Sequence, residues 1–394
     1  MTAAPTEAAI TAWLATQRQA MLAMLERMVN TDSGSADKAG VDSVGEQIKA
    51  FFAEHGIPVE VTPGAQQGDV LRAVLDAPGA ASAGANARRN IVLLGHRDTV
   101  FPRGEAARRP FRVENGLAYG PGVADMKAGL VMNCFVIAAF RKFGGHPAPI
   151  VGLFTADEEI ASPEGRPLIE AEGRMARAVF NSEPGRPSGN VVTGRKGGVF
   201  STVSIEGRAA HSGGNFEAGI SAIEELARKV QAVHALTDLA RGITLNVGVV
   251  RGGQSVNTVA PWAEFDIDFR YVEPAQREEI LARIEAIVRT ANVPGTKSSW
   301  RINGEFLPVT QGAASEALFA LYRDASGHPE LKGEFSGGCA DSGFTAAVGA
   351  PTLCGVGPVG GKAHTPEEYL EVESLVPRAQ ALARAICRLE QAGL

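Results

Sequence analysis

The stretch IVLLGHRDTVFP, residues 91–102, places an apolar strand directly before a polar cluster. Its first five residues are typical of a strand that is buried on both faces of a sheet. Side chains alternate along an extended chain, so His96 and Asp98 are expected to share one face. A metal-bound histidine usually donates its second ring N–H to a carboxylate or carbonyl. The segment therefore predicts either part of a metal site or a solvated His and Asp at a strand end.

Acidic residues also follow two other apolar strands. Glu158 and Glu159 come after PIVGLFT (149–155), and Glu183 comes after ARAVF (176–180). Within the adjacent pair, one carboxylate could bind a metal while the other acts as a general base. The alternative interpretation is a pair of surface acids in a loop.

Two further polar residues lie beside glycine-rich loops. Asp125 belongs to GPGVADMKAG (120–129), where it could also cap the helix that follows. His364 follows the glycine-rich residues 355–361. Glycine allows a ligand to approach the backbone closely, so both positions suit a binding site.

Taken together, these clusters predict a site for two metal ions. In open α/β sheets, ligands collect at the carboxyl ends of the strands. Two histidines and three or four carboxylates suit zinc, cobalt or manganese. The set exceeds what one tetrahedral zinc needs, so we expect two divalent ions, roughly 3.5–4 Å apart, with an activated water between them.

The length of 394 residues predicts two domains. The first half alternates helical and strand patterns, which favours an α/β fold with a mixed, mostly parallel sheet and helices on both faces. The expected helices cover residues 8–29, 41–55 and 128–143, and the expected strands cover residues 69–76, 90–95, 149–155 and 176–180.

The middle of the chain has a different pattern, in the order β-α-β-β-α-β. This order is typical of a ferredoxin-like α+β unit. Its expected strands cover residues 199–206, 243–250, 263–271 and 298–302, and its expected helices cover residues 219–236 and 274–291. We therefore predict a catalytic domain formed by residues 1–194 and 309–394, with a lid or dimerisation domain of residues 195–308 inserted into it.

Composition narrows the partners and the compartment. The net charge of −6 argues against a nucleic-acid partner. The apolar run at residues 128–140 is shorter than the ~20 residues needed to span a bilayer, so no membrane partner is expected. Four cysteines without a CxxC pair argue against a disulfide framework. The N-terminal sequence does not have the pattern of a signal peptide, so the expected location is cytoplasmic.

The ordered motifs resemble the M20 family of co-catalytic metallopeptidases, and most closely its glutamate carboxypeptidase (carboxypeptidase G2-like) branch. The resemblance covers nearly the whole chain and implies a zinc-exopeptidase-like catalytic domain. Its motifs are HRDTVFP (96–102), GPGVADMKAG (120–129), DEE (157–159), NSEP (181–184), GRAAHSG (207–213), SVNTVAP (255–261), DIDFR (266–270), SGGCADSGF (336–344) and GKAHTPEEYLE (361–371).

The resemblance implies a role for each candidate ligand. Asp125 would bridge both metals. His96 and Glu183 would complete the site of one metal, and Glu159 and His364 would complete the other.

It also implies roles around the metals. Asp98 would orient His96, and Glu158 would be the general base. His211 would stabilise the oxyanion, from its own subunit or from the partner subunit of a homodimer formed through the inserted domain. Without the resemblance, His211 would be interpreted as an ordinary loop histidine.

Asn257 and Arg270 match positions that contact a substrate carboxylate in the family, and Gly337 and Gly338 could offer backbone N–H groups to it. The alternative for Arg270 is a salt bridge to a neighbouring acid. Cys339 departs from the family pattern, because many relatives carry Ser or Thr there. We expect it in the wall of the pocket and not as a nucleophile.

The expected function is hydrolysis of an amide bond beside a free carboxylate, with release of a C-terminal amino acid such as glutamate. The substrate would be a small peptide or an N-acyl amino acid. The alternative within the family is a deacylase of N-acetyl or N-succinyl amino acids. Zinc is the expected metal, with cobalt and manganese compatible.

Two other classes of protein fit the sequence less well. Residues 355–360 match the dinucleotide motif GxGxxG, but Pro358 lies inside the match and the loop continues to His364 instead of opening a helix. A nicotinamide-dependent oxidoreductase is therefore disfavoured. A non-catalytic binding module is disfavoured by the complete set of acids and histidines.

Overall fold

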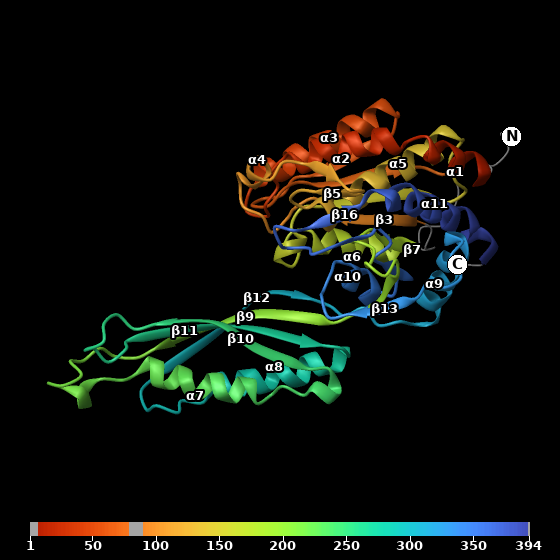
Figure 1. The fold of residues 1–394 in the computed structure, drawn as a ribbon. Helices are drawn as coiled ribbons and strands as arrows, with labels where there is room; N and C mark the ends of the chain where they lie inside the picture. The colour runs from red at the N-terminus through yellow and green to blue at the C-terminus, as the bar shows by residue number, and fades with distance from the viewer. Residues whose placement is uncertain (1–6, 79–89, 393–394) are drawn as a thin grey trace. The chain divides into compact units, whose positions relative to one another are not determined.

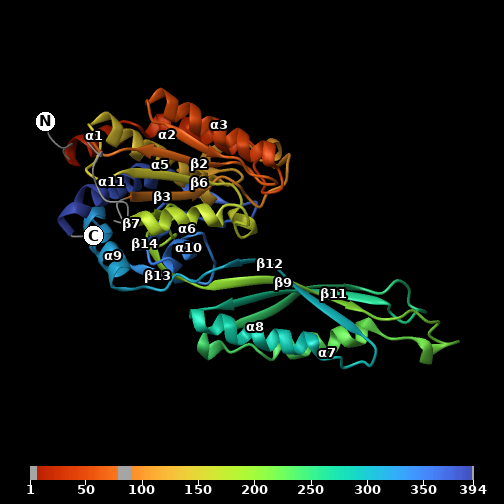
Figure 2. The ribbon, with the colours of Figure 1, turned by 180° about the vertical axis from the view of Figure 1, so that it is seen from behind.

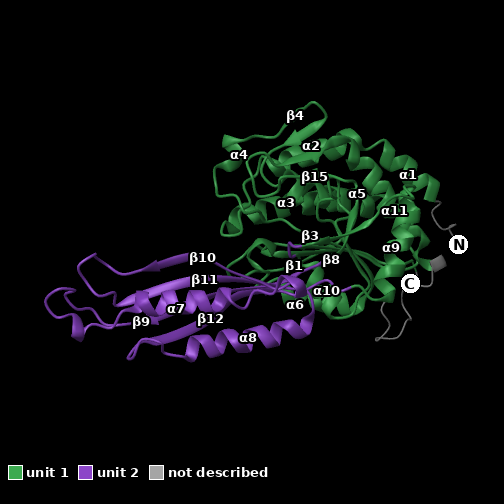
Figure 3. Ribbon diagram, turned by 60° about the horizontal axis from the view of Figure 1, so that its bottom comes forward, with its two compact units in different colours: residues 1–194, 311–336, 340–394 green, residues 195–310, 337–339 purple. Residues whose placement is uncertain are grey.

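The computed structural model describes residues 7–78 and 90–392. Residues 1–6, which belong to the N-terminal segment considered for a signal peptide, lie outside this range. The chain divides into two compact units (Figure 3). The first unit contains residues 1–194, 311–336 and 340–394, and the second contains residues 195–310 and 337–339.

The first unit is built on an eight-stranded mixed sheet. Its order is β1 (Val59–Thr62), β2 (Val70–Leu75), β6 (Ile150–Thr155), β3 (Asn90–His96), β7 (Ala176–Asn181), β14 (Thr352–Cys354), β8 (Val191–Arg195) and β13 (Gly333–Ser336). The four central strands β6, β3, β7 and β14 run parallel, whereas β1, β2 and β8 pair antiparallel with their neighbours. The carboxyl ends of the parallel strands therefore meet at one edge.

Helices cover both faces of this sheet (Figures 1 and 2). The helix α5 lies on one face and α6 on the other. Around α5 pack α1, α2, α3 and α11, while α10 packs with α6. These helices are α1 (Glu7–Ala15), α2 (Arg18–Val29), α3 (Lys38–Glu54), α5 (Ala128–Lys142), α6 (Arg166–Met175), α10 (Ser342–Ala347) and α11 (Leu375–Ala392). The predicted fold class is confirmed.

The sequence analysis gave no range for β1, β8, β13, β14, α6, α10 or α11, and three further parts of the first unit were not predicted either. They are a short helix, a longer helix that packs on α11, and a second small sheet of four strands. These elements are α4 (Glu105–Arg108), α9 (Ala313–Ser326), β15 (Gly360–Gly361), β16 (Tyr369–Glu371), β5 (Leu117–Tyr119) and β4 (Arg112–Glu114).

The strand β6 and the helix α5 are apolar on all sides because both are buried in the core of the first unit. All six residues of β6 are buried, and α5 is buried from Ala128 to Phe140. The segment Val123–Lys142 is long and apolar enough to cross a membrane, but 94% of its apolar window is buried inside the structure. It is therefore explained as the central core helix of the first unit.

The single helix predicted over residues 8–29 is wrong, because the structure has two helices there. The break falls at Thr16 and Gln17. The hydroxyl of Thr16 donates to the backbone carbonyl of Trp13 at 2.7 Å, and the amide of Gln17 donates to the Thr16 hydroxyl at 2.7 Å. Such local side-chain bonds compete with continued helix formation.

The second unit has the predicted β-α-β-β-α-β order, with a four-stranded antiparallel sheet in the order β10-β11-β9-β12. The core side chains of β11 alternate, so that Phe265, Ile267 and Phe269 are buried. Its elements are β9 (Gly197–Glu206), α7 (Ala222–His234), β10 (Thr244–Gly252), β11 (Trp262–Tyr271), α8 (Pro274–Arg289) and β12 (Lys297–Phe306).

The helix predicted from Gly219 begins three residues later. Ser221 is its N-cap, and its side chain accepts a hydrogen bond from the backbone of Glu224 at 3.2 Å. Serine is among the favoured N-cap residues, and Gly219 before it is extended. The cap therefore sets the start of the helix.

A close backbone contact in the core gives a test of this packing. A Cβ atom on Gly129, in α5, would lie 2.0 Å from the carbonyl oxygen of Ser182. We expect Gly129→Ala to lower the free energy of unfolding by about 1–3 kcal/mol in urea titrations, because the backbone has to move. Gly312→Ala is the control, since its Cβ would meet nothing within 4 Å. Gly312 is the N-cap of α9, where glycine is preferred to alanine, so we expect a smaller loss, of about 0.5 kcal/mol. Equal effects of the two variants would contradict this account.

Candidate metal centre

The site begins where two neighbouring parallel strands end. His96 is the last residue of β3 and pairs in register with Thr155, the last residue of β6. The chain after β6 forms a short 3-10 turn, Glu158–Ile160, which presents Glu158 and Glu159. Register between the strands therefore brings the histidine and the two acids to one edge.

The buried carboxylate of Asp98 connects these two strand ends. It accepts hydrogen bonds from the backbone N–H groups of Glu158 and Glu159, each at 3.1 Å, and from the hydroxyl of Ser35 at 2.6 Å. Burial acts to raise the pKa of Asp98, but His96, the Ser35 hydroxyl and the Glu159 N–H together hold it below its usual value. Asp98 thus fixes the acids that follow β6 relative to the end of β3.

Asp98 also determines which nitrogen of His96 faces the other acids. His96 Nδ1 lies 2.9 Å from the backbone oxygen of Asp98 and 3.4 Å from its carboxylate. Both partners are acceptors, so we assign a proton to Nδ1. Nε2 then faces the remaining carboxylates, which is the arrangement of a histidine ligand held by a carboxylate or carbonyl.

Five side chains form two overlapping groups at this edge. His96 Nε2 lies 3.3 Å from Asp125 Oδ1 and 3.6 Å from Glu183 Oε1. His364 Nε2 lies 3.4 Å from Asp125 Oδ2 and 3.2 Å from Glu159 Oε2. The two oxygens of Asp125 therefore face different histidines, and Asp125 belongs to both groups. It does not cap the following helix, whose N-cap position is Lys127.

The spacing and chemistry of these atoms fit divalent metal ions. Nitrogen and oxygen ligands ~2.0–2.2 Å from a tetrahedral ion lie roughly 3.3–3.6 Å from one another. The separations of 3.2–3.6 Å between these atoms fall near that range. Within the described part of the chain, the buried atoms His96 Nε2 and Glu159 Oε1 have no hydrogen-bond partner. Such atoms are expected of ligands whose partner is a metal.

The protonation equilibria of the cluster show how much negative charge it concentrates. Burial raises the pKa of Glu159 to about 7. Asp125 and Glu159 raise the pKa of His364 to about 10. Burial opposes the charge of His96, but Asp125 and Asp98 raise its pKa well above the usual value. A site with these properties stabilises a cation, whether proton or metal.

Glu368 is a functional candidate that the sequence analysis missed. Its buried carboxylate accepts hydrogen bonds from three backbone N–H groups of the Asp125 loop, those of Gly122 at 3.1 Å, Ala124 at 2.8 Å and Asp125 at 2.9 Å. Glu368 follows His364 by four residues, so it connects the segments that carry two candidate ligands. Its only sequence signal is its place in the GKAHTPEEYLE motif (361–371).

Two predicted site residues lie on neighbouring loops of the second unit. Both His211 and Asn257 are exposed, and the backbone N–H of Ser212 donates to the Asn257 carbonyl at 3.0 Å. His211 Nδ1 accepts hydrogen bonds from the N–H groups of Gly213 at 3.1 Å and Gly214 at 3.0 Å. An acceptor Nδ1 places the proton of a neutral ring on Nε2, so that Nε2–H can donate.

Arg270, also in the second unit, makes the salt bridge that was its alternative interpretation. Its guanidinium donates to the two oxygens of Asp268 at 2.6 and 3.0 Å, and Nη1 contacts Cys339 Sγ at 2.8 Å. Burial raises the pKa of the Cys339 thiol, which argues against a thiolate nucleophile. Gly338 and Gly337 belong to the same unit as Arg270 and Cys339, and the Gly338 carbonyl accepts from Arg195 at 3.0 Å.

The chain matches Peptidase family M20/M25/M40 over residues 92–388, and it belongs to this family. It is therefore a hydrolase of the metallopeptidase and aminoacylase type. The predicted family is confirmed.

Individual members of the family share 30% or less of their residues with this chain in the three comparisons that follow. The chain is 27% identical to carboxypeptidase G2 of Pseudomonas sp. (strain RS-16), over 95% of this chain and 90% of that protein. It is 30% identical to a succinyl-diaminopimelate desuccinylase of Alkalilimnicola ehrlichii, over 71% of this chain and 79% of that protein. Its fold is similar to that of an M20 family metallo-carboxypeptidase from Sulfolobus solfataricus, with a TM-score of 0.74, 16% identity, and coverage of 93% of this chain and 98% of that chain.

Replacing Glu368 tests whether it positions the Asp125 loop. Glu368→Gln places an amide N–H₂ group where an oxygen accepts backbone N–H groups, so the loop should shift. Loss of an outer-shell partner typically costs about 10–100-fold in metal affinity or activity. We expect a loss of that size in metal affinity, measured by competition with a chelating dye. The neighbouring exposed Glu367→Gln is the control and should bind metal as the wild type does. If the two variants bind metal equally well, Glu368 has no such role.

Proposed function

We propose that this chain is a two-metal hydrolase that cleaves an amide bond beside a free carboxylate and releases a C-terminal amino acid such as glutamate. The observation that carries the proposal is the position of Asp125, whose two oxygens face His96 and His364 separately. A carboxylate shared by two histidine-containing groups is the arrangement needed to bridge two ions.

We assign the ligands on this geometry. Asp125 would bridge, with His96 and Glu183 on one ion and Glu159 and His364 on the other. Zinc suits these nitrogen and oxygen ligands best, and cobalt and manganese are compatible. When bound, such a metal pair polarises the scissile carbonyl and lowers the pKa of water toward neutrality.

Glu158 is proposed as the general base. Its buried carboxylate lies 3.9 Å from His96 Nε2, beside the cluster. Burial, together with the nearby acids Glu183 and Glu159, raises its pKa well above the usual value. A carboxylate with a raised pKa accepts a proton more readily at neutral pH. Glu158 would take the proton of the attacking water and return it to the leaving amine.

The second unit would supply the remaining interactions with substrate. His211 can donate from Nε2 to the developing oxyanion, because Gly213 and Gly214 occupy Nδ1. Arg270 and Asn257 would bind the substrate carboxylate, together with backbone N–H groups at Gly337 and Gly338. The pairing of Arg270 with Asp268 holds its guanidinium in a fixed orientation, although that acid also competes with a substrate anion.

The alternative function is removal of an acetyl or succinyl group from an amino acid. It is supported by the similarity to the succinyl-diaminopimelate desuccinylase. The same metal cluster and base would serve both reactions, so the two functions differ in the groups that flank the scissile amide. We favour the carboxypeptidase because the similarity to carboxypeptidase G2 extends over more of both proteins.

We also propose a homodimer formed through the second unit and a cytoplasmic location. The edge strand β10 exposes Val249 and Val250, which a partner strand could cover. All four cysteines are free thiols, as expected in a reducing compartment.

A hydrolysis panel tests the proposed substrate class. We expect the metal-loaded enzyme to cleave folate-type glutamates or dipeptides faster than N-acetyl and N-succinyl amino acids, and to lose activity with a chelator. Arg270→Ala should lower kcat/KM at least tenfold for substrates with a free carboxylate, but much less for the same substrates amidated at that carboxylate. Faster cleavage of the N-acyl amino acids would favour the deacylase. An equal effect of Arg270→Ala on both substrate forms would remove it from carboxylate binding.

Glu158 and Glu159 are adjacent glutamates with different proposed roles, so the same substitution at each can distinguish a general base from a metal ligand. Glu158→Gln should lower kcat by about 10²–10⁴-fold while the metal content stays at the wild-type level, because a general base is lost. Glu159→Gln should lower the metal content itself. Metal analysis by plasma emission and steady-state kinetics would measure both effects. Near wild-type turnover in Glu158→Gln would exclude it as the base.

A further inference from the structure

We propose that the first unit contains a second small-molecule site, which binds a small organic anion with an apolar body. A cavity of about 350 Å³ lies between the turn at residues 188–190, the end of α9 and the first turns of α11. All of its lining residues belong to the first unit, and they include no member of the candidate metal cluster. Its volume lies in the range of ligand pockets, about 300–1,000 Å³.

The chemical basis of the proposal is the guanidinium of Arg378, which lines the cavity and is only 7% exposed. Nη2 donates to the carbonyl oxygens of Gly189 at 2.6 Å and Asn190 at 3.5 Å. In the described residues, Nε and Nη1 have no acceptor, and no carboxylate forms an ion pair with Arg378. A buried cation without a counter-ion is costly, and an anion in the cavity would compensate its charge.

The other lining residues of the cavity indicate the chemical character of the part of the ligand away from its anionic group. Tyr322, Leu331 and Val359 contribute apolar surface, and the Tyr322 hydroxyl already donates to the carbonyl of Val356 at 3.4 Å. Glu330, an exposed acid, also lines the cavity and disfavours an anion. A ligand with one carboxylate or phosphate group beside an apolar ring or chain therefore matches the wall.

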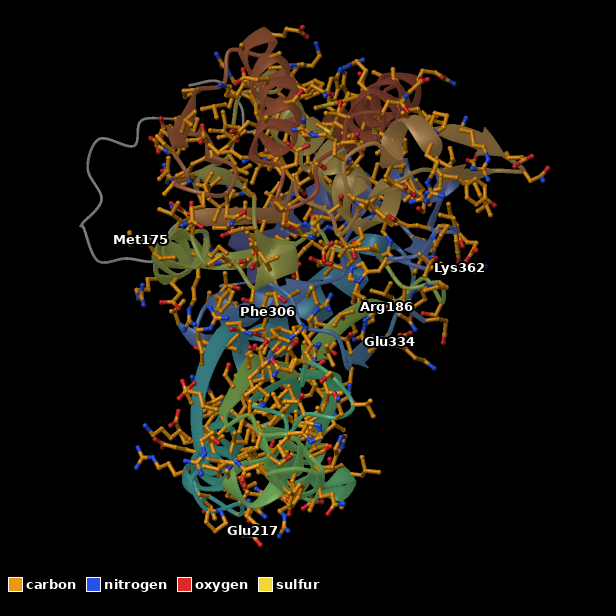
Figure 4. All side chains as sticks on the ribbon, turned by 90° about the vertical axis from the view of Figure 1, so that its left-hand side faces the viewer. Met175, Arg186, Glu217, Phe306, Glu334 and Lys362 are labelled. Carbon is orange, nitrogen blue, oxygen red and sulfur yellow. The ribbon has the colours of Figure 1, made fainter. Side chains whose placement is uncertain are left out.

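The turn that forms one wall is held in place without a ligand. The N–H of Gly189 donates to the carbonyl of Arg186 at 2.7 Å. Glu334 accepts hydrogen bonds from Ser188 Oγ at 2.6 Å and from Asn190 Nδ2 at 2.7 Å. Arg186 and Glu334 are labelled in Figure 4. Because these bonds fix the turn, the site is preformed, and binding should require little ordering of the chain.

Titration calorimetry of the metal-loaded enzyme tests the proposal with three probes of similar size. Benzoate carries a carboxylate, phenyl phosphate carries a phosphate, and benzyl alcohol is neutral. We expect at least one anionic probe to bind more tightly than benzyl alcohol, and its identity will distinguish the two head groups. Arg378→Gln keeps a polar amide side chain but removes the charge, so affinity for the anion should fall at least tenfold.

Glu330→Lys provides a second variant, at an exposed position where folding should not be affected. It should tighten binding of the same anion roughly threefold, because an opposing charge is replaced by an attractive one. This variant tests anion binding in the cavity even if Arg378→Gln fails to fold. Equal affinity in all folded variants, no preference over benzyl alcohol, or no binding of either anion at millimolar concentration would overturn the proposal.

Discussion

The hydrogen bonds of the Asp98 carboxylate are the interaction on which the candidate centre depends. They join the end of β3 to the turn that follows β6, through the backbone N–H groups of Glu158 and Glu159. The same residue orients His96 through its backbone carbonyl. One buried acid therefore determines the direction of the first histidine and the position of both following acids. Because backbone groups supply these bonds, the arrangement does not depend on the flexibility of long side chains.

A second buried acid has the corresponding function on the other side of the cluster. Glu368 binds the backbone of the Asp125 loop and lies in the same segment as His364. His364 itself has a positive φ of 64°, a region that non-glycine residues rarely adopt. Such conformations persist where the surroundings enforce them, and they concentrate at functional sites. The cluster thus gathers like charges that repel one another, and neighbouring backbone groups keep them together.

The sequence predicted the sheet and the candidate ligands that follow its strands for a single physical reason, whereas Asp125 and His364 were indicated by the glycine-rich loops beside them. The strands at residues 91–95 and 150–154 are apolar throughout, which predicts burial on both faces and favours parallel pairing with their carboxyl ends at one edge. The helix ends were predicted less accurately, because side-chain hydrogen bonds to the local backbone compete with helix formation there. The hydroxyl of Thr16 interrupts a pattern that is otherwise periodic, and Ser221 caps a helix that the periodicity starts too early. Hydrophobic periodicity reports burial and does not register these single hydrogen bonds.

By itself, the sequence determined the type of sheet, the order of elements in the second unit and the residues that the strand ends bring to one edge. It could do so because the hydrophobic pattern of each segment indicates whether that segment is a helix or a strand and which of its faces is buried. Only the tertiary structure decided that the two oxygens of Asp125 face two histidines, that Glu368 holds the Asp125 loop, that Arg270 pairs with Asp268, and that Arg378 is buried beside a cavity. Most of these contacts join segments far apart in the chain. The bond between Arg270 and Asp268 depends on side-chain orientation, which the sequence left open between two partners.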